Sequence, residues 1–104
     1  MIVQFHRAIK LADLPEGPGT LIELAGRQMA MFRRGRNVYA LDAICPHKQG
    51  PLYAGFCDEN HAYCPMHGWA FDLVSGECKE RAEKSIHSYE IRIDHDWVEV
   101  GIKI

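Results

Sequence analysis

Two short segments of the 104-residue chain each bring a cysteine and a histidine close together, and they constrain the fold more than any other feature. In CPHKQGPL, Cys45 and His47 are separated by one residue, and in CPMHGW, Cys64 and His67 are separated by two. Sixteen residues lie between the two pairs. The proline after each cysteine fixes φ, and the nearby glycines allow tight turns. The pattern predicts two stiff loops that present four ligands to one metal centre.

Composition predicts one globular domain over residues 1–104, because 47% of the residues are hydrophobic and 25% are charged. The apolar runs are far shorter than the roughly 18 residues that a membrane helix needs, and the first residues lack a signal-peptide pattern. We therefore expect a cytoplasmic protein without a membrane partner. A formal charge of -2 argues against nucleic acid as a partner. Without an export signal, cysteines beside histidines indicate metal ligands rather than disulfides.

The rest of the chain indicates short β-strands separated by turns. The segment SYEIRID places Tyr89, Ile91 and Ile93 on one face, and WVEVGIKI alternates in the same way. Such alternation is typical of half-buried antiparallel strands. Further strands are predicted over residues 20–26, 27–34 and 37–44, and one helical turn over residues 9–14. The fold class expected is all-β, a small antiparallel sandwich or barrel whose two loops form a metal-binding subdomain.

Two kinds of metal centre fit two cysteines and two histidines. One is a tetrahedral structural zinc site, and the other is a [2Fe–2S] cluster with thiolates on one iron and imidazoles on the other. Zinc fingers usually take both cysteines from one segment and both histidines from another. Here each loop supplies one of each, which favours the cluster. A zinc-stapled interaction module remains the alternative from a different functional class.

The segments CPHKQGPL and CPMHGWAFDLVSGE resemble the two cluster-binding loops of Rieske-type iron–sulfur proteins. The likeness is strongest over residues 38–79, and the flanking strands are similar to those of stand-alone Rieske ferredoxins. The resemblance implies one [2Fe–2S] cluster per chain. It also implies that Cys45 and Cys64 ligate one iron, and that His47 and His67 ligate the other.

The same resemblance implies an electron carrier rather than an enzyme, and no catalytic residue is expected. One implied role is the ferredoxin of a multicomponent oxygenase, which passes an electron from a flavin-dependent reductase to a terminal oxygenase. The alternative is the small subunit of an NAD(P)H-dependent assimilatory nitrite reductase, whose partner is the large subunit. The stretch MAMFRRGRNVYALDAICPHKQGPL resembles that second family too.

Residues around the ligands indicate a low reduction potential. Gly50 and Met66 occupy the positions at which high-potential Rieske proteins carry two disulfide-forming cysteines. Trp69 and Phe71 occupy the positions of their serine and tyrosine hydroxyls. Fewer hydrogen bonds to the cluster stabilise the reduced state less. We expect a midpoint near the low end of the Rieske range, roughly -150 mV.

Cys57 and Cys78 fall outside the ligand motif. The expected state is a pair of free, partly buried thiols. A Cys57–Cys78 disulfide or an additional redox role is the alternative.

Overall fold

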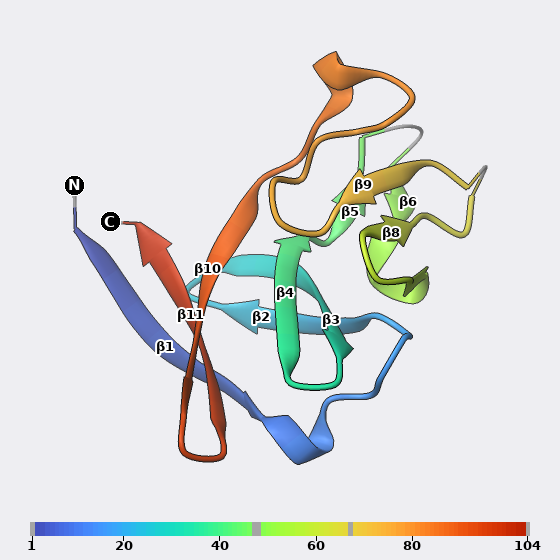
Figure 1. Cartoon of the computed structure of the whole chain (residues 1–104). Helices are drawn as coiled ribbons and strands as arrows, with labels where there is room; N and C mark the ends of the chain where they lie inside the picture. The colour runs from blue at the N-terminus through green and yellow to red at the C-terminus, as the bar shows by residue number, and fades with distance from the viewer. Residues whose placement is uncertain (1, 47–48, 67, 104) are drawn as a thin grey trace.

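The computed structural model describes residues 2–46, 49–66 and 68–103, and it divides them among three antiparallel sheets (Figure 1). The largest sheet has six strands in the order β1-β11-β10-β4-β3-β2. Their bounds are β1 Val3–Lys10, β2 Thr20–Leu24, β3 Arg27–Arg34, β4 Asn37–Asp42, β10 Ser88–Asp94 and β11 Trp97–Lys103. The chain thus leaves this sheet after β4, forms the loop region, and returns to it at β10.

The loop region holds the two small sheets. One pairs β5 (Ile44–Cys45) with β6 (Gly50–Pro51), and the other has β7 (Phe56–Cys57), β8 (His61–Tyr63) and β9 (Ala70–Asp72) in that order. The described helical segments are 3₁₀ turns: η1 Leu11–Asp13, η2 Leu52–Ala54 and η3 Ala82–Lys84. The predicted all-β class is confirmed.

Strands β3 and β4 separate two hydrophobic cores. Met29 and Met31 face one core, while Ala30 and Phe32 face the other, and all four are fully buried. Side chains alternate across a strand, so a strand buried on both faces appears as the continuous apolar run MAMF. The sheet core comprises Leu11, Leu14, Met29, Met31, Val38, Ala40, Val98, Val100 and Ile102. The loop core comprises Ala30, Phe32, Leu41, Cys45, Leu52, Cys57, Ala62, Cys64, Phe71, Leu73 and Cys78.

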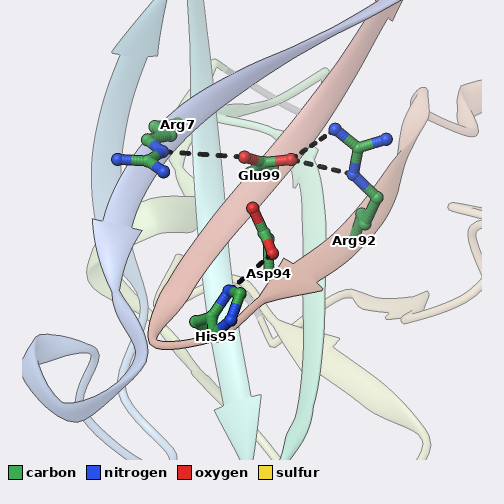
Figure 2. A network of polar contacts seen from close by, with 5 residues as sticks. All are labelled: Arg7, Arg92, Asp94, His95 and Glu99. Atoms are coloured by element: carbon green, nitrogen blue, oxygen red, sulfur yellow. Dashed lines mark hydrogen bonds and ion pairs between the residues drawn. The ribbon is translucent and has the colours of Figure 1, made fainter.

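The outer face of β1, β11 and β10 carries a row of charged side chains (Figure 2). Glu99 lies opposite Arg7 on one neighbouring strand and opposite Arg92 on the other. Its buried carboxylate contacts the Arg92 guanidinium at 2.6 Å and the Arg7 Nε at 3.7 Å. Two exposed cations therefore compensate one buried anion across three strands.

The sequence-based strand predictions agree with the structure for β2, β3, β4, β10 and β11, and the helical turn is η1. Strand β1 was missed. Its pairing with β11 shifts between Arg7 and Ile9, so a bulge interrupts the alternation that would have revealed it. No helix among the described residues is long and apolar enough to cross a membrane. The cytoplasmic location stays a prediction.

Candidate metal centre

The first loop is the hairpin between β5 and β6. Cys45 pairs with Gly50 and is fully buried at the base of the turn. Gln49, just before Gly50, has a φ of 54°, which closes the turn in the left-handed region. The predicted ligand His47 and its neighbour Lys48 lie outside the described residues.

The second loop connects β8 to β9. Cys64 follows β8 directly, and its backbone N–H donates to the Trp69 carbonyl at 2.9 Å. The Gly68 N–H donates back to the Cys64 carbonyl at 3.1 Å. Gly68 has a φ of 68°, a conformation that favours glycine. The predicted ligand His67 lies outside the described residues, but its loop is closed by these bonds.

The two loops meet at Gly50. A β-carbon added there would lie 2.8 Å from the Cys64 Sγ and 3.4 Å from both Cβ and Sδ of Met66. Real β-carbons are not found at 2.8 Å, so only glycine allows the first loop to approach the Cys64 sulfur this closely. The structure thus brings the Cys45 loop and the Cys64 loop together, as the motif spacing predicts.

The donor atoms that are described fit a thiolate-bound metal group. Cys45 and Cys64 are both buried, and both belong to the loop core. Thiolate sulfur is the ligand that iron–sulfur clusters and structural zinc share. Among the described residues no group of three metal-binding side chains gathers, and the two predicted histidines are not among them. The assignment of all four ligands stays a prediction.

A polar cluster anchors the chain where it leads into the first loop. Asp42, at the end of β4, accepts hydrogen bonds from the His87 backbone N–H at 2.9 Å and from the Tyr89 hydroxyl at 2.7 Å. Burial, together with the bond to Asp42, raises the pKa of Tyr89. The start of the first loop is thereby tied to the segment that leads into β10. The sequence analysis missed this role of Asp42 because its partners lie 45 or more residues away.

Two aspartates brace the hairpins around the second loop. Asp58 accepts the N–H groups of Asn60 and His61 and the hydroxyl of Tyr63, at 2.6 to 2.9 Å. These bonds, first that of Tyr63, lower the pKa of Asp58 to about 2. Asp72 accepts the backbone N–H groups of Val74 and Ser75. Both residues lie in the turn that ends at Gly76. In the sequence, the FD-x-x-x-G pattern of residues 71–76 indicates the Asp72 turn, whereas no pattern indicates the Asp58 network.

The apolar side chains next to the predicted ligands differ in how deeply they are buried. Phe71 is fully buried in the loop core, and Trp69 is partly buried against the same core. Met66 and Ile44 are exposed apolar side chains, one on each loop. The low reduction potential inferred from Phe71, Trp69, Gly50 and Met66 stays a prediction.

Cys57 and Cys78 are free, as expected, and both are buried more completely than predicted. Cys57 pairs with Ala62, Ala62 with Phe71, and Phe71 with Cys78. Three strand-to-strand steps therefore separate the two cysteines, roughly 14 Å along the sheet. A disulfide requires α-carbons within about 7 Å. The alternative of a Cys57–Cys78 disulfide is wrong.

Comparison with known proteins adds independent findings. The family model described as Rieske-like [2Fe-2S] domain matches residues 4–101. The ferredoxin component of the naphthalene 1,2-dioxygenase system of Pseudomonas putida is 25% identical over 96 residues, which cover 91% of this chain and 92% of that protein.

Two solved structures resemble the whole chain. The ferredoxin of carbazole 1,9a-dioxygenase from Nocardioides aromaticivorans IC177 superposes with a TM-score of 0.87 at 25% identity, covering 96% of this chain and 99% of that one. A Mycobacterium tuberculosis protein assigned as an NADH-dependent nitrite reductase small subunit has a TM-score of 0.92 at 22% identity, covering 100% and 99%. The second likeness concerns the fold alone.

Proposed function

Because the chain belongs to the Rieske-like [2Fe-2S] domain family, and its cofactor is therefore a [2Fe–2S] cluster, we propose that it is a one-electron carrier of an oxygenase system. It would accept an electron from a flavin-dependent reductase and pass it to a terminal oxygenase. The observation that supports this most is the match to a dioxygenase ferredoxin component over nine-tenths of both chains.

The cluster would be held by Cys45 and Cys64 through one iron and by His47 and His67 through the other, and it supplies reversible one-electron chemistry. The protein's own contribution is to position and shield. Cys45 and Cys64 are buried, so the thiolate side of the site is kept from water. Gly50 lets the two loops close on each other. Hydrogen bonds to the carboxylates of Asp72 and Asp42 stabilise the chain beside the two loops, where the strands are short.

The nitrite reductase small subunit is the second candidate. It shares the fold over the whole chain, so the fold does not separate the two roles. The sequence match to a ferredoxin component favours the oxygenase system.

The first experiment is an EPR spectrum of the purified protein after reduction with dithionite, together with an iron count. We expect a rhombic signal with the low average g of a histidine-ligated cluster, and two irons per chain. A colourless, EPR-silent protein that contains zinc would instead identify a structural module.

The second experiment replaces the ferredoxin component in a reconstituted naphthalene 1,2-dioxygenase system with this protein. Oxidation of naphthalene that depends on added protein would support the oxygenase role. The same protein would be mixed with a sirohaem-containing nitrite reductase large subunit. Stable binding and NAD(P)H-dependent nitrite reduction there, without activity in the oxygenase system, would favour the second candidate.

A further inference from the structure

One peptide unit of the second loop lies between a predicted cluster ligand and a carboxylate. The carbonyl of Trp69 accepts the N–H of Cys64 at 2.9 Å. The N–H of the same peptide unit, which belongs to Ala70, donates to Oε1 of Glu80 at 3.0 Å. Glu80 is thus connected to the backbone of Cys64 through two consecutive hydrogen bonds.

The bond to Glu80 takes the place of a bond that a regular ladder would make. The Lys79 N–H donates to the Ala70 carbonyl at 2.9 Å, as in an antiparallel hydrogen-bonded pair. In such a pair the Ala70 N–H would donate back to the Lys79 carbonyl. Here it donates to the Glu80 side chain instead. The strand edge that ends the second loop is therefore completed by a carboxylate.

Glu80 is an exposed residue whose Oε1 atom contacts the second loop. The buried thiol of Cys78 lies 3.8 Å from the same oxygen. No lysine or arginine among the described residues is within ion-pair distance of Glu80.

Hydrogen bonds to an ionised acceptor are about twice as strong as neutral ones, and bonds in a chain polarise one another. A carboxylate at one end of the Trp69–Ala70 peptide therefore strengthens its carbonyl as an acceptor for Cys64. A nearby negative charge also makes the addition of an electron less favourable.

We propose that Glu80 is a positioning residue for the second cysteine loop. It orients the Trp69–Ala70 peptide to accept the Cys64 amide, and it lowers the reduction potential of the cluster held by that loop. The part about the potential rests on the function proposed above, whereas the part about orientation does not.

Two variants separate charge from hydrogen bonding. Glu80→Gln keeps an acceptor oxygen but removes the charge, and we expect the midpoint potential, measured by EPR-monitored titration, to rise. Glu80→Ala removes both. Because a bond to a charged group contributes about 1.5 kcal/mol or more, we expect amide exchange in segment 64–70 to speed up about tenfold. Hydrogen-exchange mass spectrometry of the purified protein measures this.

Glu77→Gln is the matched control, because it removes the same charge from the neighbouring segment. The described hydrogen bonds of Glu77 come from its backbone rather than its side chain. We expect it to leave exchange unchanged and to shift the potential less than half as far as Glu80→Gln. Equal shifts from both variants, or unchanged exchange in Glu80→Ala, would overturn the proposal.

Failure of the proposed function has a different signature. A wild-type protein without a Rieske EPR signal would refute the electron-carrier role, while the exchange experiment would still decide the role of Glu80 in orienting the loop. If Glu80→Ala does not fold, the two glutamine variants decide. A midpoint potential that rises at least twice as far in Glu80→Gln as in Glu77→Gln is expected, and equal shifts would overturn the proposal.

Discussion

The loop core and the sheet core lie on opposite faces of β3 and β4, but they differ in residue composition and in the length of the strands around them. Four of the eleven loop-core residues are cysteines, whereas the nine sheet-core residues include none. The sheet core is enclosed by strands of five to eight residues. The loop core is covered, on the side away from β3 and β4, by strands of two or three residues. Few backbone ladder bonds are available in the loop region.

This difference in strand length indicates which interactions order each region. In the sheet, side-chain alternation and long ladders suffice. In the loop region, carboxylates supply hydrogen-bond acceptors that the backbone lacks: Asp42 and Asp58 at two hairpins, Asp72 at a turn, and Glu80 at a strand edge. The predicted metal centre adds covalent links between the two loops. The loop region should therefore be the half that depends on its ligands.

The largest effect should follow removal of a predicted ligand. Cys64→Ala is expected to abolish cluster binding, because it removes one of two thiolates, and to loosen the loop region while leaving the sheet folded. Iron analysis should show loss of the metal, and hydrogen exchange should rise in residues 43–80 but not in residues 89–103. Cys57→Ala is the control, since it removes a buried thiol outside the motif. Equal exchange increases in both regions would show that the two cores unfold as one unit.

The next largest effect concerns the shared strand β3. Phe32→Ala and Met31→Ala remove neighbouring, fully buried side chains that face opposite cores. Each is expected to cost about 3 to 4 kcal/mol in free energy of unfolding, measured by urea denaturation. Only Phe32→Ala should also weaken retention of iron, because its cavity opens in the loop core. A similar loss of iron from Met31→Ala would contradict the separation of the cores.

A smaller effect compares two glycines, one in each region. A β-carbon at Gly55 would lie 2.0 Å from the Tyr63 carbonyl oxygen, so backbone would have to move. At Gly101 the nearest atom is a side-chain carbon of Val3, at 2.8 Å, which can turn away. We expect Gly55→Ala to cost about 2 to 3 kcal/mol and Gly101→Ala less than about 1 kcal/mol. Thermal unfolding of the two variants checks the order, and the reverse order would refute this account of both sites.

The smallest effect is the acid dependence of the Asp58 network. The folded-state pKa of Asp58 is lowered to about 2, so its contribution to stability is present above the unfolded pKa of about 4 and is lost as pH falls through 2. The loss should stay below about 1 kcal/mol because the carboxylate is exposed. Urea midpoints between pH 5 and pH 2 should fall less steeply in Asp58→Asn than in the wild type. Parallel slopes would mean that other carboxyl groups dominate.

The contrast between the regions also explains what the sequence could predict. Strands β10 and β11 were predicted because alternation over seven residues reveals a half-buried strand. Strands β5 to β9 are too short to show any period, and the bulge in β1 breaks its pattern. The ligand loops were predicted from residue type and spacing alone. The contacts of Asp42 and Glu80 could not be, because each joins residues ten or more positions apart that only the folded chain brings together.

Strand β3 is buried on both faces, and this limits the substitutions that its residues can tolerate. Residues 29–32 leave no face of the strand open to water, so any change of volume there presses on one core or the other. Substitutions that adjust the environment of the metal centre from this side must be matched by compensating changes in the loop core, on the same face of the strand. Single substitutions along this stretch are therefore expected to be rare among variants that still fold.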